Sequence, residues 1–224
     1  MSAIAVAPQS ADISSSDTAV FARIASGLRE NGYAIVENAL PESLQTVLRL
    51  SQAQLSQADY HMGGIGRQSG FQRIEDIRND GVCWIDGATG GGKAWLNWTE
   101  SLRQHLNRQL FMGLFSFESH FAHYPPGHFY KTHYDAFRGQ GNRVVSLVTY
   151  LNESWSEADG GELVVYRDDN DTAGIPVLPK PGTLVAFLSE EFPHEVLPAR
   201  RDRYSVAGWF RMNTSSADVV DPPR

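Results

Sequence analysis

The second half of the chain alternates short runs rich in β-branched and aromatic residues with turn sequences. Gly160-Gly161, Asp169-Asn170-Asp171 and Pro181-Gly182 are among the turns. Many short strands without intervening helical patterns are typical of a jelly-roll or a barrel. The runs that we expect to form strands are 115–124, 128–135, 144–151, 162–166, 183–188, 195–197 and 204–210.

The first half of the chain carries the helical patterns. A helix capped by Ser16 or Asp17 is expected to end at Gly32, a second helix begins at Pro41, and a third covers 95–110. Two short strands are expected between the helices, at 33–36 and 82–85. The apolar stripes of the helices would pack on a sheet, so we predict a mainly β fold with flanking helices.

Composition narrows the class of protein. The 224 residues are 42% hydrophobic and carry a net charge of −7, which argues for one globular domain and against a nucleic-acid-binding surface. The single cysteine, Cys83, excludes a cluster of thiolate ligands. Neither a membrane-spanning length of apolar residues nor a signal-peptide pattern is evident, so we expect a cytoplasmic protein.

Domain organisation follows from these patterns. We expect residues 1–17 to form a disordered lead-in, 18–211 a single domain, and 212–224 a polar tail. The stretch 61–70 is rich in glycine and polar residues and is expected to be a mobile loop. Residues 87–93 fit the first seven positions of a phosphate-binding loop, but Ala94 lacks the hydroxyl for Mg²⁺, so we interpret them as a flexible loop.

His133 and Asp135 lie two residues apart in a predicted strand, so both side chains would point to one face. His194 follows at the start of a later strand. Two histidines and one carboxylate are the ligand set of the facial triad that holds non-haem Fe(II) and leaves coordination positions open. Calcium would need more oxygen ligands. Spacing alone leaves open the alternative that the three are surface or core groups without a common ligand.

Arg203 lies nine residues after His194, where alternation puts Arg203, Ser205, Ala207 and Trp209 on one strand face. A cation followed by two small residues indicates a pocket with a positive end, suited to bidentate binding of a carboxylate. The alternative is a solvated run of charges with Arg200 and Arg201. Tyr124 and Tyr150 are candidates for a second hydroxyl donor in this pocket, or else core aromatic residues.

The ordered motifs resemble a known family, the prolyl 4-hydroxylases of the oxygen-sensing type. The similarity covers about residues 21–210. The matching motifs are Asp76-Ile77-Arg78-Asn79-Asp80, Trp84-Ile85-Asp86-Gly87, Tyr124-Pro125-Pro126-Gly127, His133-x-Asp135, Tyr150-Leu151-Asn152, Gly160-Gly161-x-Leu163, Pro193-His194-Glu195-Val196 and Arg203-Tyr204.

The resemblance implies a double-stranded β-helix with N-terminal helices on one sheet, and dependence on Fe(II), 2-oxoglutarate and O₂, with ascorbate as an additional reductant. His133, Asp135 and His194 would bind iron. Arg203 and Tyr150 would bind the distal carboxylate of 2-oxoglutarate, and Tyr124 would line that pocket. An arginine here, where collagen-type enzymes have lysine, favours the oxygen-sensor branch and its bacterial relatives, some of which modify a proline of elongation factor Tu.

Two further expectations come from the resemblance. Residues 61–73 would be the substrate loop, and Asp80 would form an ion pair with Arg143. The predicted activity is hydroxylation of a prolyl residue in a protein, without a nucleic-acid or membrane partner. Two alternatives stay open: the same chemistry on another protein side chain or a small molecule, and a cupin-like metal-binding sensor without turnover.

Overall fold

The computed structural model describes residues 14–62, 77–136, 139 and 141–213. Most of the predicted lead-in, of the predicted loop at 61–73 and of the predicted tail therefore lies outside the described residues. Within the described ranges, no helix combines the length and apolarity needed to cross a bilayer.

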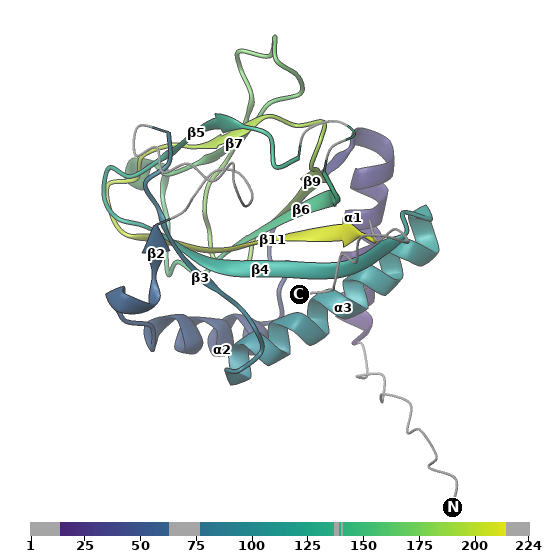
Figure 1. Cartoon of the computed structure of the whole chain (residues 1–224), viewed down its shortest axis with the longest axis horizontal. Helices are drawn as coiled ribbons and strands as arrows, with labels where there is room; N and C mark the ends of the chain where they lie inside the picture. Colours follow the sequence, from purple (N-terminus) through teal and green to yellow (C-terminus); the bar gives the residue numbers. More distant parts are fainter. Residues whose placement is uncertain (1–13, 63–76, 137–138, 140, 214–224) are drawn as a thin grey trace, which may run out of the picture.

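The described strands form two antiparallel sheets (Figure 1). The large sheet has the order β1-β9-β6-β11-β4-β3-β2, and the small sheet has the order β5-β10-β7-β8. Their strands are β1 Tyr33–Val36, β2 His61–Met62, β3 Gly81–Trp84, β4 Leu114–Tyr124, β5 Tyr130–His133, β6 Arg143–Tyr150, β7 Leu163–Val165, β8 Ile175–Val177, β9 Leu184–Leu188, β10 His194–Val196 and β11 Arg203–Met212. Strands far apart in sequence are neighbours in both sheets, as in a jelly-roll, and the predicted mainly β fold is confirmed.

The helices cover one face of the large sheet, and the small sheet lies on the other (Figure 1). Their bounds are α1 Ser15–Asn31, α2 Glu42–Ala53 and α3 Gly90–Leu110, with short 3₁₀ turns at Gln57–Asp59 and Glu157–Asp159. Between helices and sheet lies an apolar core that includes Phe21, Leu48, Trp95, Val206 and Phe210. A second apolar cluster between the sheets includes Tyr124, Tyr150, Leu163, Val165 and Phe187. Because side chains alternate between the two faces of a strand, the central strands of the large sheet contribute residues to both apolar clusters.

Some predicted boundaries are wrong. Ser14, rather than Ser16 or Asp17, caps α1, because its hydroxyl accepts the Asp17 backbone N–H at 3.1 Å. Strand β8 was not predicted because Pro176 lies in its middle. Proline is tolerated in β8 because this strand is the edge of the small sheet.

The predicted flexible loop at 87–93 is helical from Gly90 onward. The Thr89 hydroxyl accepts the Gly92 N–H at 3.0 Å and caps α3. Gly91 lies against α2, where a Cβ atom would come within 2.3 Å of the Val47 carbonyl oxygen. The glycine at position 91 therefore permits a close approach of two helices. Glycines taken only as a sign of a loop do not predict this packing.

We predict that Gly91→Ala lowers the free energy of unfolding by about 1–3 kcal/mol, because the added methyl group must push α3 away from α2. Gly90→Ala is the matched control. At Gly90 a Cβ meets no described atom within 4 Å, and alanine favours the helical backbone by up to about 1 kcal/mol. Urea unfolding of both variants measures this. Equal stability of the two variants would contradict the packing argument.

Candidate metal centre

Pairing between two strands of the small sheet brings the predicted histidines together. Strands β5 and β10 are antiparallel, and His133 lies directly opposite His194 in their register. The ring centroids are 4.2 Å apart. Asp135 follows β5 by two residues, and its carboxylate lies close to both imidazoles.

The three side chains surround one point. Asp135 Oδ1 lies 3.8 Å from His133 Nε2, and Asp135 Oδ2 lies 3.6 Å from His194 Nε2. Their ligand atoms all lie within 4.8 Å of one another, and the three residues are mostly or fully buried. This is the separation expected of atoms that share one metal ion.

Backbone carbonyls orient both imidazoles. His133 Nδ1 donates to the Lys131 carbonyl at 2.8 Å, and His194 Nδ1 donates to the Phe192 carbonyl at 3.1 Å. Each ring is thereby held in the tautomer that leaves the Nε2 lone pair for a metal. Burial, and then the neighbouring His194, lower the pKa of His133 to about 3, so this imidazole is neutral near pH 7.

Asp135 is held as a carboxylate. Burial acts to raise the pKa of Asp135. The opposing effect is larger and holds the pKa of this carboxyl below its usual range; it comes from His194, His133, the Arg143 guanidinium and a hydroxyl donor. The donor is Ser146, whose hydroxyl lies 2.6 Å from Oδ2. Two imidazoles with one carboxylate form a donor set that suits non-haem Fe(II).

Sequence reasoning missed Ser146 and its partner Ser189, which lies 2.9 Å away. The signal was present, because Ser146 is the lone serine of the apolar run 144–148. Buried polar side chains need hydrogen-bond partners, so a buried serine of this kind points to a nearby polar site.

Arg203 is the predicted cation, and it is buried rather than solvated. Its side chain lies in the interior at 1% exposure, whereas Arg200 and Arg201 are exposed. The Nε atom donates to the Gly161 carbonyl at 2.8 Å and Nη1 donates to the Ser205 hydroxyl at 3.2 Å. The alternative of a solvated run of three arginines is therefore wrong for Arg203.

Unsatisfied polar atoms collect beside this guanidinium. Arg203 Nη2 and the Tyr150 hydroxyl are buried and have no hydrogen-bond partner among the described residues. The rings of Tyr124 and Tyr150 lie 5.1 and 5.2 Å from Arg203 Cζ. Burial raises the pKa of Tyr150 to about 12, so its hydroxyl keeps its proton and can donate.

A buried guanidinium nitrogen and a buried hydroxyl that lack hydrogen-bond partners in the described part of the chain are costly unless an anion binds to both. A carboxylate group fits because it accepts from both at once. The predicted pocket residues Arg203, Tyr150 and Tyr124 are thus brought together on the inner side of the large sheet.

The predicted ion pair between Asp80 and Arg143 is wrong. Among the residues that the structure describes, Asp80 forms its ion pair with Arg78, and Arg143 forms its ion pair with Glu118, with Nη2–Oε1 at 2.9 Å. Sheet register explains this. Asp80 precedes the pairing of Gly81 with His123, whereas Arg143 is aligned with Arg211, near the opposite end of β4. Arg143 also lies over the Trp209 ring, with Cζ 3.6 Å from the centroid.

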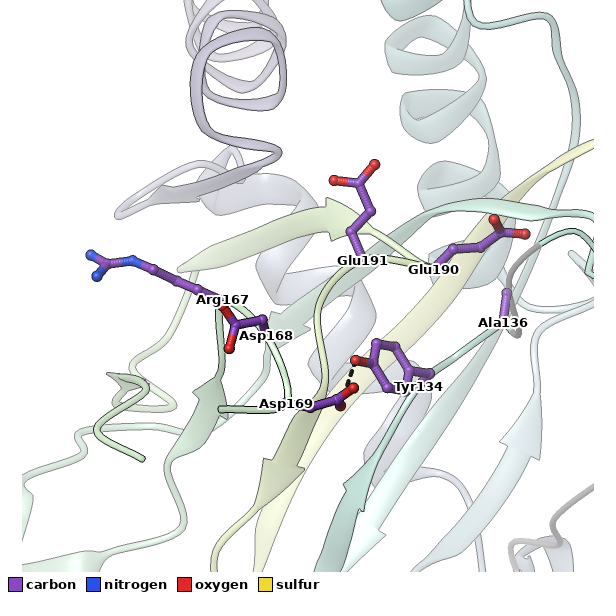
Figure 2. A pocket seen from close by; sticks show the side chains of 7 residues that line it. All are labelled: Tyr134, Ala136, Arg167, Asp168, Asp169, Glu190 and Glu191. Atoms are coloured by element: carbon purple, nitrogen blue, oxygen red, sulfur yellow. Dashed lines mark hydrogen bonds between the residues drawn. The ribbon is translucent and has the colours of Figure 1, made fainter. Parts of the chain in front are cut away.

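A hollow of about 290 Å³ is lined in part by Tyr134 and Ala136, the chain neighbours of Asp135 (Figure 2). Its lining is largely acidic, and the Tyr134 hydroxyl donates to Asp169 across it at 2.7 Å. The described lining includes none of His133, Asp135 and His194; it consists of Tyr134, Ala136, Arg167, Asp168, Asp169, Glu190 and Glu191. This hollow is therefore separate from the space into which the three ligand atoms point.

Comparisons with known proteins agree with this geometry. Residues 119–211 match the family model of the 2OG-Fe(II) oxygenase superfamily. A prolyl-4-hydroxylase from Pseudomonas putida, solved as a crystal structure, is 38% identical, with a TM-score of 0.75 over 86% of this chain and 98% of that chain. A prolyl hydroxylase from Trichoplax adhaerens, in complex with a hypoxia inducible factor peptide, is 27% identical, with a TM-score of 0.72 over 87% of this chain and 90% of that chain.

Curated relatives are longer. The hypoxia-inducible factor prolyl hydroxylase of Caenorhabditis elegans is 29% identical over 85% of this chain, and the human protein Egl nine homolog 1 is 30% identical over 61%. The matches span only 28% and 33% of those proteins.

The jelly-roll and the donor set define a metal-dependent oxygenase scaffold. The chain belongs to the 2OG-Fe(II) oxygenase superfamily, and the predicted double-stranded β-helix is confirmed by its relatives. Membership implies Fe(II), 2-oxoglutarate and O₂ as cofactor and co-substrates, for which the site offers a matching donor set.

Proposed function

We propose that the protein is an Fe(II)- and 2-oxoglutarate-dependent dioxygenase that hydroxylates a prolyl residue of a protein substrate. One observation carries the proposal: the His–Asp–His cluster and the buried, incompletely paired guanidinium of Arg203 face the same interior space. Ser146, which binds Asp135, and Tyr150, which lies beside Arg203, occupy the same face of β6 four residues apart. The apolar ring of Phe187 lies 4.6 Å from that of His194 and belongs to the same cluster as Tyr150.

The proposal assigns a task to each side chain. His133, Asp135 and His194 would hold Fe(II) through two Nε2 atoms and one carboxylate oxygen. Arg203 Nη2 and the Tyr150 hydroxyl would bind the distal carboxylate of 2-oxoglutarate, while the buried ring of Tyr124 holds the guanidinium in place.

When bound, the Fe(II) ion would supply the activation of O₂, coupled to the oxidative decarboxylation of 2-oxoglutarate to succinate and CO₂. The protein itself orients the three ligand side chains and excludes water from the pocket. Carbonyl oxygens and Ser146 fix the direction of the three ligands. Buried apolar side chains keep water from the pocket; they are Leu163, Val165, Val177, Phe187 and Val196.

A group of aromatic side chains next to Ser146 in the large sheet supports a proline as the reacting residue. Trp209 lies opposite Ser146 in the pairing of β11 with β6. His120 lies 5.5 Å from Trp209, and Trp84, which is 50% exposed, lies 5.3 Å from His120. A group of rings that is partly open to solvent is the kind of surface on which proline-containing segments dock. The prolyl hydroxylases among the relatives support the same substrate class.

We further propose elongation factor Tu as the protein substrate. The resemblance to bacterial members of the oxygen-sensor branch, with Arg203 in place of lysine, is the basis for this choice. Similarity to a prolyl-4-hydroxylase from a bacterium is consistent with the bacterial branch.

The proposed activity can be tested by mass spectrometry. Incubation of the iron-loaded protein with 2-oxoglutarate and purified elongation factor Tu, or an extract of the source cells, should add one oxygen to a proline and release succinate in equal amount. Asp135→Ala should abolish both, because the metal loses its only carboxylate ligand from the described residues. Asp169→Asn, which alters an exposed carboxylate outside the cluster, should leave both unchanged.

Each outcome is informative. Oxygen found on a proline of another protein would overturn the choice of elongation factor Tu and keep the prolyl hydroxylase. Oxygen found on a different residue type or a small molecule would overturn the prolyl substrate. Succinate release that persists in Asp135→Ala would overturn the oxygenase assignment.

Arg203→Gln tests the co-substrate pocket. Loss of the charge-assisted hydrogen bonds should raise the KM for 2-oxoglutarate by about 10- to 100-fold. Affinity for the metal in the absence of 2-oxoglutarate should stay unchanged, because the metal ligands remain. Arg200→Gln removes an exposed charge three residues away and is the matched control. An unchanged KM in Arg203→Gln would contradict the assigned role.

A further inference from the structure

The imidazole of His133 is stacked against another ring. The Tyr130 and His133 ring centroids are 3.5 Å apart, and the ring planes differ by 13°. The guanidinium of Arg78 lies over the same tyrosine, with Cζ 4.7 Å from the ring centroid. Arg78 is fixed in turn by Asp80, with Nε–Oδ1 at 2.5 Å and Nη2–Oδ2 at 2.9 Å, and the Asp80 side chain is 0% exposed.

Hydrogen bonds between the segment 77–80 and the residues around the start of β5 hold this stack in register. The segment 77–80 runs antiparallel to the start of β5, with an isolated bridge between Arg78 and Tyr130. Lys131 N–H donates to the Ile77 carbonyl at 2.9 Å, and Phe129 N–H donates to the Asn79 side chain at 2.8 Å. The guanidinium is therefore placed over Tyr130 by the backbone as well as by its ion pair.

His133 is more exposed than His194, with 16% against 6% of its side chain accessible to solvent. It lies at the end of a four-residue strand whose side chains are partly exposed, and its one side-chain hydrogen bond to a described residue is to Lys131 in the same strand. A single hydrogen bond fixes the tautomer of an imidazole but allows the ring plane to tilt about that bond. A parallel ring at van der Waals distance removes this freedom.

We propose that Tyr130 and Arg78 are positioning residues for metal binding. The guanidinium, anchored by Asp80, attracts the face of Tyr130, and Tyr130 fixes the plane in which His133 presents Nε2 to the metal. The inference rests on the proposed function, because it takes the His–Asp–His cluster as a metal site. It adds a set of residues that do not touch the metal but determine how well His133 binds it.

The chain contains a matched pair for control. Tyr204 and His123 form a second parallel stack, with centroids 4.5 Å apart and planes 14° apart. His123 pairs with Asp202 and belongs to no described metal cluster. Tyr204→Leu therefore removes a similar stack without altering the candidate metal centre.

The test measures binding of Co(II) by calorimetry and the visible absorption of bound Co(II), which reports ligand geometry independently of activity. Tyr130→Leu should weaken Co(II) affinity by about tenfold and alter the absorption spectrum. Tyr130→Phe keeps the ring and should stay within about threefold of the parent. Tyr204→Leu should keep both affinity and spectrum. An unchanged affinity and spectrum in Tyr130→Leu, or an equal loss in Tyr204→Leu, would overturn the inference.

A double-mutant cycle tests the contribution of Arg78. Arg78→Gln should weaken Co(II) binding in the parent but not further in the Tyr130→Leu background, because its effect passes through the ring. Equal losses in both backgrounds would overturn the role of Arg78. Failure of the proposed function is seen separately: the parent would not bind Co(II), or Asp135→Ala would bind it equally well.

Discussion

Antiparallel pairing of β5 with β10 is the constraint on which the site depends. It sets His133 opposite His194, 61 residues later in the chain, on the inner side of the small sheet. Because side chains alternate along a strand, a shift of one residue would turn one histidine away from Asp135. The pairing is supported on its other side by β7, where His194 is aligned with Val165. The ligand geometry is thus a consequence of sheet register, which is strongly specified where one face is buried.

The inner side of the large sheet supplies the second condition, a fixed cation in a dry space. Arg203 begins β11 opposite Tyr124, and Ser205 lies opposite Tyr150. Alternation then places the guanidinium, a small hydroxyl and two phenol rings together. Burying a guanidinium whose Nη2 lacks a partner among the described residues is costly for the fold alone. The arrangement is understandable if a carboxylate binds there during function, which links the stability of this region to its ligand.

Much of the fold could be predicted from local patterns, because period-2 runs and turn residues are local properties. The strands around His133, Tyr150 and Arg203 follow from them, and the order of His133, Asp135 and His194 in the chain indicated the cluster. Contacts set by register could not be predicted in this way. The ion pair expected between Asp80 and Arg143 depends on which ends of β3 and β6 meet. The family resemblance identified Asp80 and Arg143 in the sequence. In the structure, Asp80 pairs with Arg78 and Arg143 pairs with Glu118.

Other errors arose where tertiary packing overrides composition. Glycine at position 91 favours a loop when read alone, yet here it allows two helices to touch. Ser146 and Tyr130 gave weak signals because a serine in a strand and a tyrosine beside a turn are common. Ser146 is important because the fold brings it to Asp135, and Tyr130 is important because the fold stacks it against His133.

The most direct test of this account is a crystal structure of the protein with Mn(II) and 2-oxoglutarate, prepared without O₂. The account predicts one Mn(II) ion bound by His133 Nε2, Asp135 and His194 Nε2. The distal carboxylate of 2-oxoglutarate should lie within hydrogen-bond distance of Arg203 Nη2 and the Tyr150 hydroxyl. A metal ion bound elsewhere, or 2-oxoglutarate bound away from Arg203, would contradict it.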